Sequence, residues 1–439
     1  MKKIITLKSS KSKSLSGIID IPGDKSISHR ALIFSSLCYG CSEIFGLLEA
    51  DDVLNTLKSL KKLGVKIVKR KRHYTVFGNG GSFEEPKSAL NFGNSGTGVR
   101  LFSGLLASKN ISATLIGDKS LSKRPMYRII KPLEKLGANI KHNDGFLPLK
   151  IDKSNFLHKS TLKEKLGSAQ VKSAIILASL DIKGTTTIQE HRTSRNHSEI
   201  LLKFLGANIK IENEKNYKKI SITGPNTMKA KNIFIPGDIS SAAFIIVAAL
   251  LCEGSEIKIN SVGINFFRTG ILEVLKKMNG NISITKTRKE NGEKIADIEI
   301  KSSKLKSCKV GHRLTSRLID EYPILFVAAS FAEGVSIFKN LQELKFKESD
   351  RLSAMSEALK KCGVEVEESD DQIKIFGKRI QKGGCKINTY NDHRIAMAML
   401  IFGLNAENPV EIDKANMIKT SFPNFYDLLF TIGAQINYV

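Results

Sequence analysis

The chain has 439 residues and a formal net charge of +26 at pH 7, and this length exceeds one ordinary hydrophobic core, so at least two domains are predicted. No apolar run reaches the roughly 18–20 residues that span a bilayer, and residues 1–13 lack the apolar segment of a signal peptide, so a cytoplasmic protein without a membrane partner is expected. The charge is spread along the chain and only 7% of residues are aromatic, which favours small anions over nucleic acid as partners.

The first segment that indicates chemistry is Gly23 to Arg30, which reads Gly-Asp-Lys-Ser-Ile-Ser-His-Arg. A strand-like run precedes it and an apolar, helix-like run follows it. The unpaired N–H groups of a helix N-terminus favour an anion, and Lys25 and Arg30 add a point charge and a planar fork that suit phosphate or carboxylate. The segment predicts an anion site, with an ordinary capped helix as the alternative.

Other helix starts in the first half carry similar donors. Residues 92–100 form a glycine-rich loop that enters a helix pattern, although it does not end as a P-loop does. Lys123 and Arg124 precede a helix, and residues 168–170 and 193–197 begin two more with hydroxyl, amide and basic side chains. Taken singly, the last three segments, at residues 123–124, 168–170 and 193–197, are better explained as ordinary helix capping.

One pattern recurs six times along the chain: a leucine, an apolar residue three positions later, a glycine next to it, and Ile or Val three positions after that. The glycine positions are 64, 137, 206, 279 (here an Asn), 363 and 433. The two apolar positions share a helix face, and the glycine suits a helix C-cap with positive φ. The pattern predicts six helix–glycine–strand modules, arranged as two domains of three.

The tetrapeptide Ile-Pro-Gly-Asp occurs at Ile21–Asp24 and again at Ile235–Asp238, with three modules between the two copies. Pro fixes φ and Gly frees it, which suits a sharp change of direction. We therefore place the crossings between domains at these segments. The first domain is predicted over 22–236 and the second over 1–21 plus 237–439, with a strand over 4–21 belonging to the second.

The second half adds acidic residues to the basic ones. Asp320 and Glu321 stand between apolar runs, residues 345–351 alternate in charge, and residues 391–394 again precede an apolar helix. Carboxylates and bases at helix starts can converge on one cleft, although a solvated charged face is the alternative. The pattern predicts an interdomain cleft that clamps anionic substrates between basic walls, with acid–base groups from the second domain.

Cys38 and Cys41 form a single C-x-x-C, and without a second pair a structural zinc site is poorly supported. A redox motif is not favoured either, because the pair lies at the end of a helix pattern. The other four cysteines, Cys252, Cys308, Cys362 and Cys385, are interpreted as small buried apolar residues in a reducing compartment.

At these segments the sequence resembles the family of 3-phosphoshikimate 1-carboxyvinyltransferases, or EPSP synthases. The matching motifs are GDKSISHR, FGNSGTGVR, KRPM, SAQVKSA, IDEYPI, KESDRLSAM and NDHRIAMAM, in the family's order along nearly the whole chain. The residues of the motifs KRPM and SAQVKSA are similar to those of the class II branch of the family. This branch is associated with tolerance of the inhibitor glyphosate.

The resemblance implies an α/β (α+β) fold, the two-domain inside-out α/β prism with three βαβαββ repeats around buried helices in each domain. It implies an enzyme of the shikimate pathway, in chorismate and aromatic amino acid biosynthesis. This enzyme transfers the enolpyruvyl group of phosphoenolpyruvate to the 5-hydroxyl of shikimate 3-phosphate and releases phosphate. No metal or organic cofactor is expected, and the chain is expected to act as a monomer.

The resemblance also assigns site residues by motif position. Shikimate 3-phosphate is expected to contact Ser26, Arg30, Thr97, Ser168, Ala169, Gln170, Ser194, Arg195, Asp320 and Lys347. Phosphoenolpyruvate is expected to contact Lys25, Gly96, Arg124, Gln170, Arg351 and Arg394. Asp320 would take the proton of the attacking hydroxyl, and Glu348 or Lys25 would protonate the methylene carbon.

Two positions depart from the family's pattern. Lys419 is displaced by one position from the lysine that many members carry before a Thr-Phe-Pro segment, and it receives no role. Gly96 stands where some tolerant members carry alanine. Because the alanine methyl is absent, sensitivity to glyphosate is predicted despite the similarity of these motifs to class II.

Two alternatives stay open. A sister enolpyruvyl transferase acts on UDP-N-acetylglucosamine, but its usual Lys-Asn pair is Lys25-Ser26 here and its mobile-loop cysteine has no counterpart between residues 105 and 130. A non-enzymatic, basic nucleic-acid-binding protein is the alternative from another class.

Overall fold

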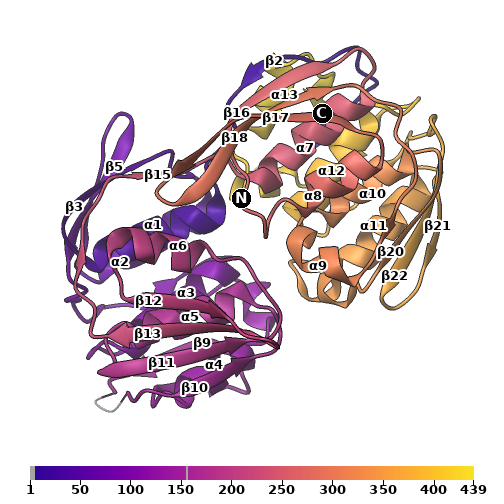
Figure 1. Cartoon of the computed structure of the whole chain (residues 1–439). Helices are drawn as coiled ribbons and strands as arrows, with labels where there is room; N and C mark the ends of the chain where they lie inside the picture. The colour runs from indigo at the N-terminus through magenta and orange to yellow at the C-terminus, as the bar shows by residue number, and fades with distance from the viewer. Residues whose placement is uncertain (1–4, 155–156) are drawn as a thin grey trace. The chain divides into compact units, whose positions relative to one another are not determined.

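The computed structural model describes residues 5–154 and 157–439, which form two compact units (Figure 1). The first unit comprises Gly23–Ile235 with Glu290–Glu293, and the second comprises the chain up to Pro22, Pro236–Lys289 and Lys294–Val439. The chain thus passes between units within the two Ile-Pro-Gly-Asp segments and on either side of Glu290–Glu293. Among the helices of the described ranges, none is both long enough and apolar enough to cross a membrane.

In the described part of the first unit the strands form three sheets on one plan: a parallel pair at one edge, followed by antiparallel pairs. The first sheet contains β14 (Met228–Lys229), β15 (Ile233–Phe234), β3 (Cys38–Phe45), β5 (His73–Asn79) and β4 (Lys66–Lys69). The second contains β6 (Leu90–Asn91), β7 (Ala113–Ile116), β9 (Phe146–Asp152) and β8 (Asn139–Asn143). The third contains β10 (Thr161–Glu164), β11 (Gly184–Glu190), β13 (Lys218–Gly224) and β12 (Ile209–Asn213).

Two kinds of helix accompany these sheets. The central helices α1 (Lys25–Ser36), α3 (Gly96–Ala107) and α5 (Ala169–Ser179) are buried along most of their length, and most of their residues are small or apolar. The remaining helices are amphipathic or short: α2 (Asp51–Lys62), η1 (Leu121–Lys123), α4 (Tyr127–Glu134) and α6 (His197–Leu205). The N-termini of the central helices carry most of the site residues predicted in the first half.

The second unit repeats the plan with three sheets among its described residues. The first contains β2 (Ser16–Ile19), β16 (Glu256–Gly263), β18 (Glu293–Lys301) and β17 (Asn281–Glu290). The second contains β19 (Lys309–Val310), β20 (Gly334–Lys339), β22 (Gln372–Gly377) and β21 (Glu365–Glu368). The third contains β23 (Lys386–Ile387), β24 (Val410–Ile412), β1 (Leu7–Ser9) and β25 (Ile436–Tyr438).

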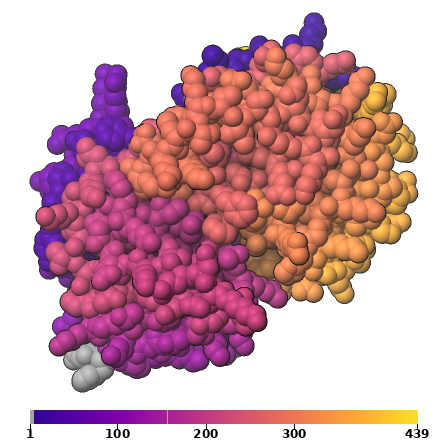
Figure 2. All heavy atoms as spheres, viewed as in Figure 1, coloured from indigo at the N-terminus to yellow at the C-terminus, as the bar shows by residue number. Residues whose placement is uncertain are grey.

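The prediction of a single strand over residues 4–21 is wrong, and Ile4 lies outside the described residues. The segment contains two strands in different sheets, since β1 pairs with β24 and β25 whereas β2 pairs with β16. The Ser- and Lys-rich residues 10–14 between them supply no apolar alternation to continue a strand. Figure 2 shows these early residues, in indigo, among the orange and yellow surface of the second unit.

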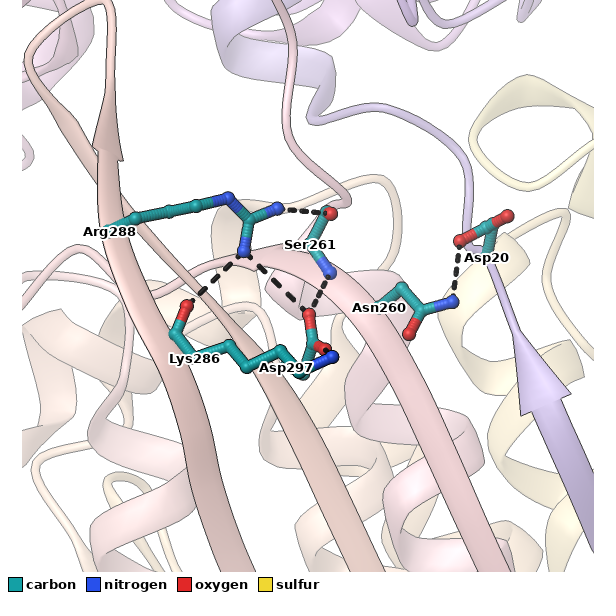
Figure 3. A pocket seen from close by; sticks show the side chains of 6 residues that line it. All are labelled: Asp20, Asn260, Ser261, Lys286, Arg288 and Asp297. Carbon is teal, nitrogen blue, oxygen red and sulfur yellow. Dashed lines mark hydrogen bonds and ion pairs between the residues drawn. The ribbon is translucent and has the colours of Figure 1, made fainter.

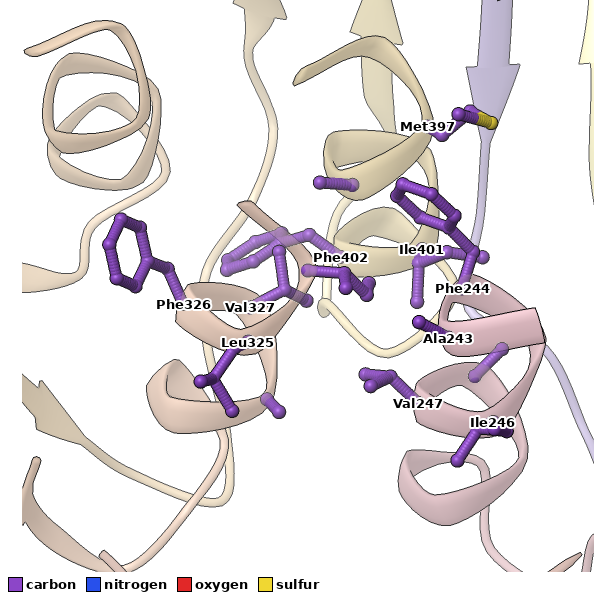
Figure 4. Packing of buried hydrophobic residues seen from close by; sticks show 14 of the residues in the cluster. Ala243, Phe244, Ile246, Val247, Leu325, Phe326, Val327, Met397, Ile401 and Phe402 are labelled. Atoms are coloured by element: carbon purple, nitrogen blue, oxygen red, sulfur yellow. The ribbon is translucent and has the colours of Figure 1, made fainter. Parts of the chain in front are cut away.

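The core of the second unit lies between its three central helices, α7 (Ile239–Leu251), α10 (Tyr322–Ser330) and α12 (His393–Gly403). Figure 4 shows buried side chains from all three helices, among them Val247 of α7, Val327 of α10 and Phe402 of α12. The remaining helices are α8 (Gly270–Lys277), α9 (His312–Leu318), η2 (Gln342–Phe346), α11 (Arg351–Lys361), η3 (Ala415–Thr420) and α13 (Phe425–Thr431).

The predicted sixfold module is confirmed at its most specific point, the helix C-terminus. Each of the six repeat positions follows a helix, precedes a strand and has positive φ, between 69° and 99°. Asn279 has a φ of 69°, and asparagine is among the non-glycine residues that tolerate this conformation best. The repeated pattern in the sequence therefore encodes a repeated helix ending.

Candidate active site

Lys25 is the first residue of α1, and its side chain reaches a carboxylate on α2. The carboxylate of Asp24 caps the helix by accepting from the N–H of Ile27 at 2.8 Å. The Nζ of Lys25 lies 3.0 Å from Oδ2 of Asp52, and both side chains are only partly exposed. The segment is therefore both a capped helix and a cationic site, and Asp52 is a partner that sequence reasoning did not identify.

The guanidinium of Arg30 is buried in a shell of hydroxyl and carbonyl oxygens. Its Nε donates to Oγ of Ser198 at 2.7 Å, Nη2 donates to Oγ of Ser173 at 2.8 Å, and Nη1 donates to the carbonyl of Ser26 at 2.9 Å. Burial lowers the pKa of Arg30 to about 10, partly offset by the carboxylate of Glu199, so the group still carries its charge at neutral pH. These neutral acceptors fix the orientation of Arg30 without neutralising it.

Thr97 at the start of α3 and Gln170 at the start of α5 are brought together. The amide of Gln170 donates to Oγ1 of Thr97 at 2.9 Å and accepts from Nη1 of Arg100 at 2.5 Å. Ser168 caps α5, and the carbonyl of Ala169 accepts from Oγ of Ser173, the hydroxyl that also contacts Arg30. The starts of α1, α3 and α5 thus carry one connected set of polar groups.

Gly96 and Arg124 are neighbours. A Cβ on Gly96 would lie 3.3 Å from Nη1 of Arg124 and 3.1 Å from Nη1 of Arg100, both tighter than ordinary contacts. Arg124, which follows η1, also donates to the side chains of Asn94 and Ser120. Glycine at position 96 therefore leaves room for two guanidinium groups beside the first turn of α3.

Ser194 precedes α6 and is bound to a buried carboxylate. Its N–H and Oγ both donate to Oε1 of Glu190, at 3.0 and 2.6 Å. Lys172, whose side chain has no exposed surface, lies 2.8 Å from Glu190 and 2.8 Å from Glu199. Burial disfavours the charge of Lys172, but the two carboxylates outweigh burial and raise its pKa. Arg195, next in the chain, is partly exposed.

In the second unit the predicted residues gather around Arg351, the first residue of α11. The guanidinium contacts three carboxylates: Oδ2 of Asp392 at 2.8 Å, Oε2 of Glu348 at 2.5 Å and Oδ1 of Asp320 at 3.5 Å. Nζ of Lys347 lies 3.9 Å from the same Asp320 oxygen. Segments far apart in the sequence therefore converge on one cluster.

Arg394, at the start of α12, joins this cluster through the backbone. Its Nη1 donates to the carbonyl of Asp320 at 3.0 Å, and its N–H donates to Oδ1 of Asp392 at 2.9 Å. Asp392 caps α12 while it binds Arg351, so one carboxylate fixes the positions of two arginines.

Burial and ion pairing act in opposite directions on this cluster. Burial alone would lower the pKa of Arg351, but Asp392 and Glu348 outweigh it and raise that pKa. Burial alone would likewise raise the pKa of Asp392, but Arg351 holds it below its ordinary value. Both groups are therefore charged at neutral pH, as a buried hydrogen-bonded pair requires.

Sequence reasoning missed several residues inside the motifs that it quoted. Asp392 stands two positions before Arg394, and Lys172 stands two positions after Gln170. The available signal was a charged residue within an apolar helix pattern, which favours burial with a partner. Lys419 lies in η3 with an exposed side chain, and no role follows from its position.

One hollow among the described residues lies away from these side chains. It is an open cavity of about 530 Å³ on the sheet of β2, β16, β17 and β18, and it contains none of the predicted site residues. In Figure 3 its side chains satisfy one another: Arg288 donates to Oγ of Ser261, and the N–H of Ser261 donates to Asp297. No group of three or more His, Cys, Asp or Glu residues that could hold a metal ion occurs among the residues described.

Comparisons with known proteins agree with the motifs. The family model described as EPSP synthase (3-phosphoshikimate 1-carboxyvinyltransferase) matches residues 9–429. The chain is 45% identical to a 3-phosphoshikimate 1-carboxyvinyltransferase of Bartonella henselae over 100% of both chains, and 44% identical to that of Parvibaculum lavamentivorans over 97% of this chain and 95% of the relative. It is also similar to the EPSP synthase structure from Acinetobacter baumannii, with a TM-score of 0.89 and 38% identity over 100% of both chains. The predicted two-domain α/β fold is thereby confirmed.

Proposed function

This chain belongs to the EPSP synthase (3-phosphoshikimate 1-carboxyvinyltransferase) family. We propose that the polar groups at the starts of α1, α3 and α5, together with the cluster around Arg351, bind its substrates and move its protons. The chain is a transferase of the shikimate pathway. It moves the enolpyruvyl group of phosphoenolpyruvate to the 5-hydroxyl of shikimate 3-phosphate and releases phosphate. Family membership favours this activity over transfer to UDP-N-acetylglucosamine.

Shikimate 3-phosphate is assigned chiefly to the polar groups at the starts of α1, α3 and α5. Arg30 retains its charge in a shell of hydroxyl and carbonyl groups, so a phosphate beside it meets a preoriented cation. Helix N-termini add N–H donors for the same anion. The residues proposed to contact this substrate are Ser26, Arg30, Thr97, Ser168, Ala169, Gln170, Ser194, Arg195, Asp320 and Lys347.

Phosphoenolpyruvate carries a carboxylate and a phosphate, and the residues assigned to it are mainly cationic. Lys25, Arg124, Arg351 and Arg394 supply the charges, Gln170 supplies an amide, and Gly96 leaves the space between two guanidinium groups. Asp392 binds Nε of Arg351 and thereby fixes the plane of its guanidinium.

The proton transfers are assigned to Asp320, Glu348 and Lys25. Asp320 would accept the proton of the 5-hydroxyl while that oxygen bonds to the central carbon of phosphoenolpyruvate. Glu348 or Lys25 would donate a proton to the methylene carbon, which gives a tetrahedral intermediate that expels phosphate and returns one methyl proton to base. The observation that carries this assignment is the convergence of Asp320, Lys347, Glu348 and Arg351 on one cluster.

Phosphate release from purified protein tests the activity. Release that requires both phosphoenolpyruvate and shikimate 3-phosphate, and that falls strongly in Lys25→Ala, is the expected result. A matched control is Lys62→Ala, an exposed lysine in the last turn of α2. Release with UDP-N-acetylglucosamine in place of shikimate 3-phosphate would contradict the acceptor assignment.

We further propose that the chain works as a cytoplasmic monomer that does not bind nucleic acid. Its positive charge is spread along the sequence rather than gathered in a tail. Light scattering during size-exclusion chromatography should give the mass of one chain. Retention on DNA at physiological salt, with a steep loss on adding salt, would contradict the last part.

A further inference from the structure

Cys362 and Cys385 lie within reach of each other in the second unit. Their Sγ atoms are 2.7 Å apart, whereas a disulfide bond measures about 2.0 Å. Cys362 is the C-cap residue of α11, and Cys385 directly precedes β23. The two segments are aligned by their backbones, since the N–H of Gly383 donates to the carbonyl of Cys362 at 3.2 Å and the carbonyl of Cys385 accepts from Glu411 at 3.0 Å.

We propose that Cys362 and Cys385 form an oxidisable dithiol, which a small-molecule disulfide converts into an intramolecular disulfide bond. The proposal is independent of the transferase activity, because neither sulfur belongs to the residues assigned to substrates. Two thiols held side by side by hydrogen-bonded backbone need little movement to bond.

The two thiols differ in access and acidity, which sets the order of events. Cys385 is partly exposed, and the thiol of Cys362 together with the charge of Lys361 lowers its pKa. Cys362 is buried, and its pKa is raised by the hydrogen bond with Cys385 and by burial. Since the thiolate is the nucleophile in thiol–disulfide exchange, Cys385 attacks first and Cys362 resolves the product.

The exchange balances in two steps. The thiolate of Cys385 bonds to one sulfur of the small disulfide, whose S–S bond breaks and releases one thiolate. Cys362 then loses its proton and attacks Sγ of Cys385, which expels the second thiolate. Two protein thiols are oxidised, one small disulfide is reduced, and the two released thiolates take up the two protons.

The other cysteines provide an internal contrast. Burial raises the pKa of Cys252 to about 12 and that of Cys308 to about 11, which leaves little thiolate at neutral pH. Cys41 on β3 is exposed, so it reports whether the reagent is active. In a mixture of all six thiols, only the pair 362–385 is expected to lose two hydrogens without retaining the reagent.

The experiment treats the intact protein with oxidised glutathione, followed by digestion and mass spectrometry. We expect a peptide containing Cys362 linked to one containing Cys385, cleaved again by a reductant, while Cys41 retains glutathione. In Cys362→Ser we expect Cys385 to retain glutathione, because the resolving thiol is absent. In Cys385→Ser we expect Cys362 to stay unmodified.

Two results would overturn the proposal. One is retention of glutathione on Cys385 in the unsubstituted chain, and the other is modification of Cys41 while Cys362 and Cys385 both stay reduced. A second readout is thermal unfolding of the Cys41→Ser protein before and after oxidation. Because the bond joins residues 23 positions apart, it restricts the unfolded chain, and a rise in Tm on the order of several °C is expected. A lower Tm for the linked protein would show that the bond distorts the native structure.

Discussion

The buried charges of the first unit and those of the second differ in how far they reach the surface. In the first, Lys172 and its partners Glu190 and Glu199 have at most 1% of their side-chain surface exposed. In the second, Arg351 and Asp392 are equally buried, but the other two carboxylates on Arg351, Asp320 and Glu348, are 20% and 22% exposed. The first network is closed to solvent, whereas the second leaves two carboxylates partly exposed, as the proposed proton transfers require.

The comparison also shows how each network uses its charge. Oε1 of Glu190 accepts from Lys172 and from both the N–H and Oγ of Ser194, so it fixes the backbone before α6. Arg351 instead holds its partly exposed carboxylates near one another and near Lys347. An effect on chemistry is therefore expected from the second network, and effects on stability and substrate affinity from the first.

The largest expected effect is on kcat, and it separates the Arg351 network from the Lys172 network most directly. Asp320→Asn and Glu348→Gln should each lower kcat by about 10²–10⁴, the usual contribution of a general acid or base. The free energy of unfolding should change little, because both side chains are partly exposed. Steady-state kinetics and urea unfolding measure the two quantities. A kcat near that of the unsubstituted enzyme would show that the carboxylate is not a proton-transfer group.

Lys172→Met should lower stability and substrate affinity rather than kcat. Two buried carboxylates lose their partner, which destabilises a protein by about 3–5 kcal/mol when a buried pair is broken. The loosened Ser194–Arg195 segment should raise KM for shikimate 3-phosphate while KM for phosphoenolpyruvate stays near its starting value. Lys172→Arg keeps the charge and should restore part of the affinity. Where the methionine variant does not fold, Glu190→Gln gives the same KM comparison.

His29 gives the first unit a predicted response to acid. Burial, together with Lys25 and Arg30, lowers its pKa to about 3 from an ordinary 6.5, so the folded chain binds its proton less readily than the unfolded chain. A depressed histidine pKa means that stability falls as pH drops from about 6.5 to about 3, by a few kcal/mol in total. His29→Gln, which can still bind Oγ1 of Thr56, should flatten that part of the pH profile. An unchanged dependence of stability on pH would show that groups other than His29 cause the loss of stability in acid.

Gly96→Ala tests the crowding beside the first turn of α3. The added Cβ lies 3.3 Å from Arg124 and 3.1 Å from Arg100, so at least one guanidinium must shift. Overpacking of this kind costs about 1–3 kcal/mol, which corresponds to a rise in KM for phosphoenolpyruvate of about 5- to 150-fold where the whole cost falls on binding. The unsubstituted enzyme lacks an alanine methyl at position 96 and is therefore predicted to be sensitive to glyphosate. Full activity at millimolar glyphosate, with phosphoenolpyruvate limiting, would contradict that prediction.

The fold was more predictable from sequence than the site because its signal is local and repeated. The leucine and glycine positions identify a helix ending, and the positive φ of Asn279 shows that the pattern survives one substitution. The link between Lys25 and Asp52 joins residues 27 positions apart on separate helices, and no local pattern encodes it. The same holds for Cys362 with Cys385, and for the break between the strands Leu7–Ser9 and Ser16–Ile19, which belong to two different sheets.

Gly206→Ala gives the smallest expected effect and sharpens the comparison most. Gly206 ends α6, the helix that carries Ser198 and Glu199, and a Cβ there would meet no atom within 4 Å. Only the left-handed backbone, with a φ of 97°, opposes the alanine, which costs about 1–2 kcal/mol. Stability should fall by that amount while KM for shikimate 3-phosphate stays constant. If KM for shikimate 3-phosphate rose in Gly206→Ala as in Lys172→Met, general destabilisation of α6 would explain both increases. That result would contradict a positioning role for Lys172.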